Sequence, residues 1–415
     1  MTESRRRPRG TAAAIGAGAL VLALTTPSAA VAVDDYPSWD DVEKARKNEA
    51  DKRAQIEKIE RLIRGLDREA ADLGRVALER GEAYHLAQDA LETATAEADE
   101  QYAAAEAAQR AAEESRQRAA GVIAQLARAG GGDITATLLT SSAEDADRLL
   151  ERLGLMTRVS RASAELLRTA IFDRNAAEQL ADGAAAAEDE RDERARSAKA
   201  LLREAEAAAK DASGRAAERR KAEATLIAQL ARLKGTTADT ERGYREGLAW
   251  EREQEEQKEP PADPGDGDSG TPGAPPVDPT PPAPPVTGKV DGAIAFAKAQ
   301  IGEPYRLGGA GPNVWDCSGL TKTAYANVGV YIGTHSATNQ YSTMAAQGRL
   351  VKISQIKAGD LLFYSSGGSA SGSKYHVTLY IGGGQMIEAP YPGETVRIRA
   401  VRYGDLVPYA GRPTG

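Results

Sequence analysis

Apolar residues recur every three or four positions through the middle of the chain, between residues 38 and 257. One frame joins Ile56, Ile59, Ile63, Leu66, Ala70, Leu73, Ala77, Tyr84, Ala87, Leu91, Ala94 and Ala98, with Arg80 as its one misfit. Such a 3-4 spacing, held over about six heptads, is typical of a coiled-coil seam. Because the seam is narrow and rich in alanine, it suits helix-on-helix packing and not a globular core.

The same region predicts where its helices end. No proline occurs between Trp39 and Glu259, and Gly130-Gly131-Gly132-Asp133 is expected to end the first long helix. A shorter amphipathic piece should follow, with Leu138, Leu139, Leu149, Leu150 and Leu153, and then a second long helix from about Leu155 to Lys234. The simplest arrangement is an antiparallel helical hairpin. Its role stays open among a spacer, a self-inhibiting cover, a docking rod for a partner and a purely structural coiled coil.

Histidine is rare in this chain, with three residues in 415. One of them, His85, lies beside the coiled-coil seam in a helix that is otherwise rich in alanine and charge. We expect it to be a plain surface histidine.

The hydrophobic pattern changes after the helical region. Residues 258–288 hold eleven of the 20 prolines, with Gly, Asp and Thr between them, which predicts an extended linker without a core. The remaining segment, 289–415, holds 13 of the 20 aromatic residues. The chain is therefore expected to be multidomain, with a signal segment (1–32), a helical arm (33–257), a linker (258–288) and a small C-terminal domain (289–415).

The first residues have the organisation of a targeting signal. Four arginines (Arg5, Arg6, Arg7 and Arg9) precede a short apolar run over 12–24, and Ala30-Val31-Ala32 supplies the small residues of a cleavage site. The apolar run is shorter than the roughly 20 residues of a membrane span. We expect a chain exported to the cell wall or the medium, without a stable membrane span once the signal is removed.

Charge separates the two main regions. The chain carries 53 Lys and Arg against 61 Asp and Glu, a net charge of −8, which argues against nucleic acid as its main partner. Residues 289–415 carry 12 basic and 7 acidic residues, a net charge of +5. A small basic domain suits an anionic polymer such as a cell wall.

The single cysteine, Cys317, excludes an intramolecular disulfide and any thiolate-rich metal site. No His, Asp or Glu cluster has a workable ligand spacing, so no metal or cofactor is expected. Asp316 is a plausible N-cap for a helix running to about Asn327. That cap would put Cys317 in the first helical turn, where free N–H groups and the macrodipole favour a thiolate.

A base for this thiolate is expected on a strand. His376 opens an alternating run through Ile381, three glycines turn the chain, and Gln385 to Ala389 return. If the glycines form a simple three-residue loop, residue 376 pairs with residue 390. Glu388 then lies on the same face as His376, one diagonal step away, and can orient the imidazole. The three residues would form a nucleophile, base and orienter set.

The C-terminal segment also resembles the NlpC family of cell-wall cysteine endopeptidases over about residues 290–410. The motifs occur in the family's order: Tyr305-x-x-Gly308-Gly309, Asp316-Cys317-Ser318-Gly319-Leu320, Gly359-Asp360-Leu361, His376-Val377-x-x-Tyr380-x-Gly382 and Glu388-Ala389-Pro390. The resemblance implies a papain-like α+β core with an antiparallel sheet. It also implies hydrolysis of a peptidoglycan stem peptide, usually between D-γ-glutamate and a diamino acid such as diaminopimelate.

By this resemblance Cys317 is the nucleophile, His376 the base and then the acid, and Glu388 the orienting residue. Tyr305 would sit near the oxyanion. Asp316, Ser318 and Ser336 would line the pocket for the stem peptide. Apart from the resemblance, we expect His335 to be a loop or substrate-groove residue and not the base, because it lacks a strand context and an obvious orienter. The order of coiled coil, linker and peptidase is similar to secreted Gram-positive division hydrolases, in which the coiled coil keeps the enzyme quiet or docks it on a membrane activator.

Two other functions remain open at this point. One is an acyl- or amide-transferring relative on the same fold, which would form product only with an added acceptor. The other is a wall-binding or scaffolding protein that acts through its coiled coil.

Overall fold

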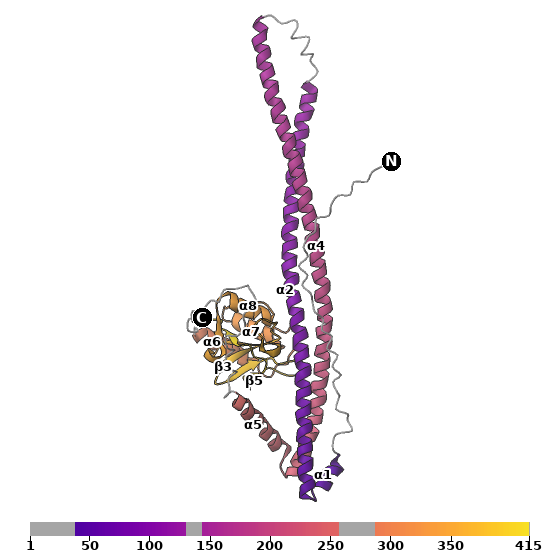
Figure 1. The fold of residues 1–415 in the computed structure, drawn as a ribbon, viewed down its shortest axis with the longest axis vertical. Helices are drawn as coiled ribbons and strands as arrows, with labels where there is room; N and C mark the ends of the chain where they lie inside the picture. The colour runs from indigo at the N-terminus through magenta and orange to yellow at the C-terminus, as the bar shows by residue number, and fades with distance from the viewer. Residues whose placement is uncertain (1–37, 130–142, 257–286, 415) are drawn as a thin grey trace, which may run out of the picture.

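The computed structural model describes residues 38–129, 143–256 and 287–414, with a long helical arm and a small α+β domain beside its lower half (Figure 1). The expected signal segment, most of the linker, Leu138 and Leu139 lie outside the described residues. None of the described helices combines the length and the apolar character that a membrane crossing requires.

The arm is built from two very long helices that run side by side, α2 (Glu49–Ala129) and α4 (Ala143–Lys234) (Figure 1). A short helix, α1 (Trp39–Ala45), precedes them, and α5 (Ala238–Glu256) leads away from the base. The second helix begins at Ala143, earlier than expected, so the amphipathic piece around Leu149 is part of it. Its end is as predicted, because Gly235 takes a φ of 75° directly after Lys234.

The predicted seam is the buried face between α2 and α4. Its buried members include Ile59, Ile63, Ala70, Ala77, Ala94 and Ala98. Within the described part of the arm, branched residues form a compact cluster at the base, where Ile59 and Ile63 pack against Leu226 and Leu230 of α4. Alanines take over higher up, as expected for a narrow helix-on-helix contact.

The C-terminal domain has three helices and a six-stranded sheet. The helices are α6 (Thr287–Ala299), α7 (Cys317–Ala326) and α8 (Ala337–Ala346). The strands are β1 (Leu350–Lys352), β2 (Leu361–Tyr364), β3 (His376–Gly382), β4 (Gln385–Glu388), β5 (Arg397–Ala400) and β6 (Tyr409–Gly411). The sheet order is β1-β6-β2-β3-β4-β5, and all neighbouring strands are antiparallel. The expected fold class, a helical hairpin followed by an α+β domain with an antiparallel sheet, is confirmed.

Strand alternation gives this sheet two buried faces. Val377 and Leu379 of β3 belong to the core shared with the helices, together with Phe363 of β2. Leu362 of β2 and Met386 of β4 belong to a second cluster. The sheet is therefore packed on both sides, and the start of β3 lies next to α7.

Candidate active site

Cys317 is the first residue of α7, as the sequence predicts. Its neighbour Asp316 is the N-cap, with an extended backbone and a carboxylate that accepts a hydrogen bond from the Gly319 amide at 2.7 Å. The Cys317 sulfur interacts with the backbone amide of Val377 on β3. The thiol thus lies directly beside the peptide that follows His376.

The hairpin of β3 and β4 brings His376 and Glu388 together. Leu379 faces Ile387 and Tyr380 faces Met386, which is the register expected for residue 376 opposite residue 390. A bulge between Tyr380 and Gly382 disturbs the turn but leaves this register intact. The imidazole Nε2 of His376 lies 3.0 Å from Glu388 Oε2, so the predicted diagonal contact is present.

Arginines fix the charge of Glu388. Arg397 Nε lies 3.2 Å and Arg402 Nη1 lies 3.0 Å from Glu388 Oε1. Burial alone would raise the pKa of this carboxyl group, but Arg402, His376 and Arg397 outweigh burial and hold the pKa well below its usual range. Glu388 is therefore an anion that accepts a hydrogen bond from Nε2–H of His376.

The His376 ring is neutral and can accept a proton. Burial lowers the pKa of this imidazole and outweighs the contact with Glu388, which opposes the change. Its Nδ1 is buried without a hydrogen-bond partner. With the proton of the neutral ring on Nε2, the Nδ1 lone pair is free to accept a proton from a nearby thiol.

The protonation state of the Cys317 thiol differs from the expectation. The helix start was expected to favour a thiolate, but burial, then Asp316, raise the pKa of Cys317 well above its usual value, and the Val377 amide opposes this only in part. Cys317 is only 6% exposed, and Glu82 of the arm adds to the upward shift of its pKa. Desolvation and the two nearby carboxylates outweigh the backbone amides of Val377 and Ser318, so the thiol is protonated in this conformation.

The other candidate residues gather around the start of α7. Tyr305 and Cys317 belong to the same buried cluster, and Ser318 donates to Asp316 Oδ1 at 3.2 Å. Ser336 is the N-cap of α8 and is fully buried. His335 Nε2 lies 2.8 Å from Asp316 Oδ1, so this ring contacts the N-cap of α7 and is separate from the His376–Glu388 pair.

A carboxylate from the arm reaches into this site. Glu82 of α2 is 4% exposed and accepts hydrogen bonds from the Ser336 hydroxyl at 2.6 Å, the Ala337 amide at 3.0 Å and the Thr338 amide at 2.9 Å. These donors form the start of α8, where an anion is favourable. Sequence reasoning missed Glu82, because a glutamate in a charged helix is ordinarily a solvated residue.

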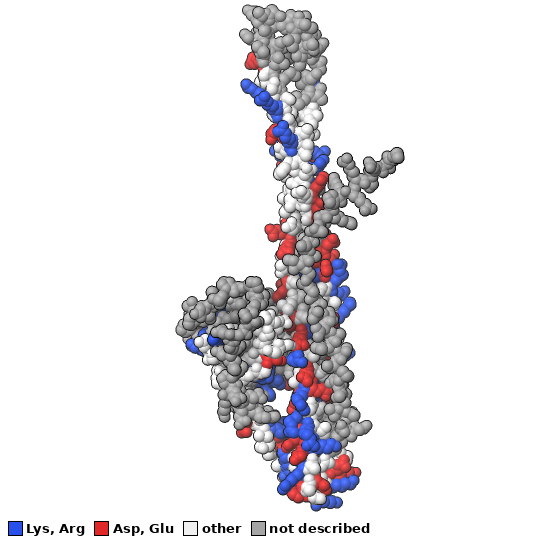
Figure 2. All heavy atoms as spheres, viewed as in Figure 1, with Lys and Arg blue, Asp and Glu red and all other residues white. Residues whose placement is uncertain are grey.

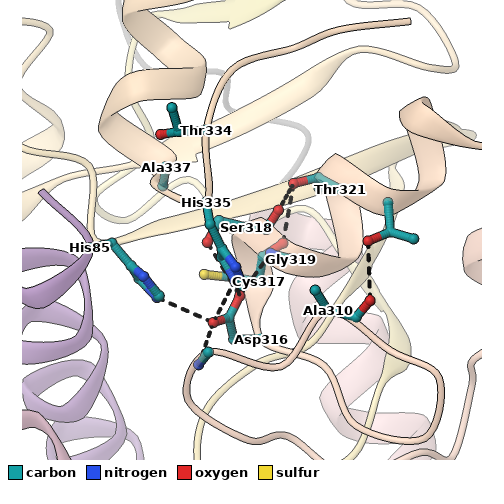
Figure 3. A network of polar contacts seen from close by, with 12 residues as sticks. His85, Ala310, Asp316, Cys317, Ser318, Gly319, Thr321, Thr334, His335 and Ala337 are labelled. Atoms are coloured by element: carbon teal, nitrogen blue, oxygen red, sulfur yellow. Dashed lines mark hydrogen bonds and ion pairs between the residues drawn. The ribbon is translucent and has the colours of Figure 1, made fainter. Parts of the chain in front are cut away.

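The prediction for His85 is wrong. The residue is 5% exposed, its Nε2 lies 3.2 Å from Asp316 Oδ2, and its ring stacks on that of His335 with centroids 4.6 Å apart. Figure 3 shows the His85 side chain reaching from α2 toward Asp316, beside Cys317 and His335. The side chain is buried because the C-terminal domain packs on this face of the arm. This contact joins segments that are more than 200 residues apart in the sequence.

Small residues on α2 allow this close packing. A Cβ at Gly74 would lie 2.5 Å from the ring of Tyr391, and a Cβ at Gly81 would lie 2.9 Å from Leu307. Leu78, between the two glycines, joins the buried core of the C-terminal domain. Two glycines one heptad apart inside a long helix are unfavourable by about 1 kcal/mol each, and this was the available signal of a second contact face.

The C-terminal part of this chain is similar in sequence to known proteins. Residues 302–408 match the model of the NlpC/P60 family. The chain is 42% identical to Protein P54 of Enterococcus faecium over 119 residues, which is 28% of this chain and 21% of that protein. It is 38% identical to the peptidoglycan endopeptidase RipB of Mycobacterium tuberculosis over 136 residues, which is 30% of this chain and 52% of that protein. The matched region thus spans about a fifth of the length of Protein P54 and about half of the length of RipB.

Two solved structures are also similar in sequence to the C-terminal domain. The NlpC/p60 domain of the peptidoglycan hydrolase SagA is 39% identical, with 29% of this chain and 97% of that chain covered and a TM-score of 0.26. The P60 domain of antigen MAP1204 from M. avium subspecies paratuberculosis is 33% identical, with 31% and 97% covered and a TM-score of 0.27. The motifs and the family match over residues 302–408 lead to one conclusion: the C-terminal part of this chain is an NlpC/P60 domain.

Proposed function

We propose that the chain is an exported cysteine endopeptidase that cuts a stem-peptide bond of peptidoglycan, with D-γ-glutamyl to diamino acid as the bond, and that its helical arm holds it latent. One observation carries the catalytic part. Cys317 begins a helix beside Val377, while the adjacent His376 has a free Nδ1 and an Nε2 held by Glu388. The name of RipB, a peptidoglycan endopeptidase, supports the substrate class.

The proposed reaction gives each of these groups a distinct role, and His376 acts in turn as base, acid and base. Nδ1 of His376 takes the proton from the Cys317 sulfur, and the thiolate attacks the scissile carbonyl carbon. First-turn N–H groups of α7, which lack helical acceptors, and the Tyr305 phenol face the oxyanion. His376 then gives its proton to the leaving amine, and water, deprotonated by the same imidazole, releases the acyl group from Cys317. Glu388 keeps the ring oriented and stabilises the imidazolium.

Latency is proposed from the arm contacts. Leu78, Glu82 and His85 bury the side chains that begin α7 and α8, so a stem peptide has no open path to Cys317. Further contacts, from Glu79 to Ser366 and from Asp89 to Thr334, line both sides of these residues. Because Glu82 also raises the pKa of Cys317, departure of the arm both opens the cleft and favours the thiolate.

The test compares the C-terminal domain, residues 287–415, with the full chain on purified peptidoglycan, with products identified by mass spectrometry. We expect new D-γ-glutamyl ends from the domain, much slower release by the full chain, and none from Cys317→Ala in either form. Release that persists in Cys317→Ala would overturn the peptidase proposal. Equal rates for the domain and the full chain on a soluble stem peptide would overturn latency alone, and product that needs an added acceptor would identify a transferase.

A second role for the arm is suggested by its far half. Exposed apolar side chains occur there on α2 and α4: Ile123, Leu167, Ile171 and Phe172, which is 72% exposed. They lie in or beside a groove of about 1030 Å³ between the helices. We propose that a membrane-bound activator docks on this groove and draws the arm from the domain. Phe172→Ser should then abolish activation by the partner while the latent chain stays folded.

A further inference from the structure

Three possible metal ligands from distant parts of the chain meet at the junction of the arm and the domain. They are His85 of α2, the α7 N-cap Asp316 and His335 of the loop before α8, and their ligand atoms all lie within 4.8 Å of one another. Asp316 Oδ2 lies 3.2 Å from Nε2 of His85 and 2.9 Å from Nε2 of His335. In Figure 3 both imidazoles point toward this carboxylate, next to the Cys317 sulfur.

We propose that these three side chains bind one Zn²⁺ ion, which fastens the arm to the domain. In tetrahedral zinc sites with bonds of about 2.0–2.1 Å, ligand atoms lie about 3.3 Å apart. The two nitrogen-to-oxygen distances, 3.2 and 2.9 Å, are close to this value. Water takes the fourth position, and the two rings, now 12° from parallel, tilt toward each other so that both Nε2 lone pairs meet the ion.

The surroundings support a bound cation. The Asp316 carboxylate is oriented by backbone amides, with Gly308 N 2.8 Å from Oδ2 and Gly319 N 2.7 Å from Oδ1. Hydrogen bonds of this kind commonly orient carboxylates that bind metals. The His85 ring is buried and its Nδ1 has no partner, so its polar contact is made at this cluster. Glu82 and Asp89 add negative charge nearby.

The donor set selects the class of metal. Two neutral imidazoles and one carboxylate suit zinc and its neighbours in the first transition row, whereas magnesium and calcium prefer oxygen ligands. The expectation of no metal site rested on spacing along the chain, and here 231 residues separate His85 from Asp316. Tertiary structure alone brings the ligands together.

The proposed ion links metal binding to the position of the arm. His85 comes from the arm and the other two ligands from the domain, so the complete site exists only when the arm is docked. A ligand that binds one state shifts the equilibrium toward that state, by about 100-fold at a free concentration 100 times its dissociation constant. Zn²⁺ would therefore reinforce the latent state. That consequence for activity rests on the proposed peptidase function, but the binding itself does not.

Binding is tested in the full chain carrying Cys317→Ala, which removes the thiol as an alternative zinc ligand. Zn²⁺ is titrated against a chromophoric chelator, and thermal unfolding is followed with and without ZnCl₂. We expect one equivalent bound with a dissociation constant in the micromolar range or below, and a higher unfolding temperature. Adding His85→Gln should weaken binding at least tenfold and remove the temperature shift.

Glu79→Gln is the matched control, because Glu79 joins the arm to Ser366 but is neither a ligand nor one of the charges named as acting on His85. It should retain zinc affinity within about threefold. Binding that is undiminished by His85→Gln, or no binding at all, overturns the proposal. Since the Cys317→Ala chain cannot use a thiol nucleophile, these outcomes do not depend on whether the domain is a peptidase. In the chain with Cys317, EDTA should raise basal hydrolysis and His85→Gln should abolish that response.

Discussion

Two buried histidines in this molecule each face a carboxylate, yet their pKa values are shifted in opposite directions. Burial lowers the pKa of His376 despite its bond to Glu388. Burial also acts to lower the pKa of His85, but Asp316, Glu82 and Asp89 outweigh it and raise the value. A histidine beside a carboxylate thus favours a neutral ring in one place and a charged ring in the other.

The difference lies in what else touches the carboxylate. Glu388 is neutralised by Arg397 and Arg402, so little of its charge is left to attract a proton onto His376. No arginine is among the hydrogen-bonding partners described for Asp316, and two further acidic groups of the arm add to its effect on His85. A neutral ring suits a general base, whereas a cationic ring, or one bound to a metal, suits a contact that holds two parts together.

The largest expected effect breaks the His376 side of this comparison. In the released domain, His376→Ala should lower kcat/KM by about 10³-fold, because general-base catalysis contributes roughly 10²–10⁴-fold. Hydrolysis of a soluble stem peptide measures it. His335→Gln is the control, since this ring contacts Asp316 and not the proposed reacting atoms, and its loss should stay below about tenfold. Reversed effects would move the base to His335.

The second largest effect is expected from removing a contact between the arm and the domain. In the full chain, Glu82→Ala removes three hydrogen bonds to Ser336, Ala337 and Thr338. A loss of about 2 kcal/mol in docking would raise basal hydrolysis about 30-fold. Glu106→Ala, an exposed residue of the distal arm paired with Arg110, is the matched control and should change nothing. A rate within twofold of the parent would show that Glu82 does not hold the arm.

The third effect tests the close approach of the helix. Gly74→Ala places a methyl group against the Tyr391 ring, and crowding of about 1–2 kcal/mol should raise basal hydrolysis about tenfold. Gly65→Ala meets nothing within 4 Å, so it should stabilise the helix by about 1 kcal/mol without changing latency. Thermal unfolding and hydrolysis distinguish the two results. Equal latency in both variants would place the domain farther from α2.

The smallest effect is on pH. Because the docked pKa of His85 is raised, its contribution to docking is complete below about pH 6.5 and is lost as the pH rises through the docked value. The groups that face the ring are Glu82, Asp89, Asp316 and His335. With EDTA present, so that no metal ion occupies His85, the ratio of full-chain to domain activity should therefore rise with pH, by less than the glycine effect. A ratio whose slope is unchanged in His85→Gln would contradict this account.

The local parts of the site could be predicted from the sequence. Asp316 before a helical pattern places Cys317 at the helix start, and strand alternation places His376 and Glu388 on one face. Both inferences span fewer than 15 residues, over which backbone geometry dictates direction. The bulge beside Gly382 did not alter them, because the paired part of the hairpin keeps its register.

The protonation of Cys317 and the partners of His85 could not be predicted in this way. The partners of His85 lie more than 200 residues away along the chain, and the pKa of Cys317 depends first on burial and then on Asp316. Helical periodicity is silent about tertiary contacts and burial of this kind. Gly74 and Gly81 carried a trace of the second face, since glycine is otherwise disfavoured in a helix. Nothing in the sequence indicated which surface would meet it.

The sequence by itself therefore determined the helical seam, the helix start at Cys317 and the shared strand face of His376 and Glu388, because each follows from short-range periodicity and spacing. Only the tertiary structure decided that Glu82 caps α8, that His85 meets Asp316 and His335, and that Cys317 is buried as a thiol. Those features depend on desolvation and on charges brought together across the whole chain, which exist only once the arm and the domain are packed.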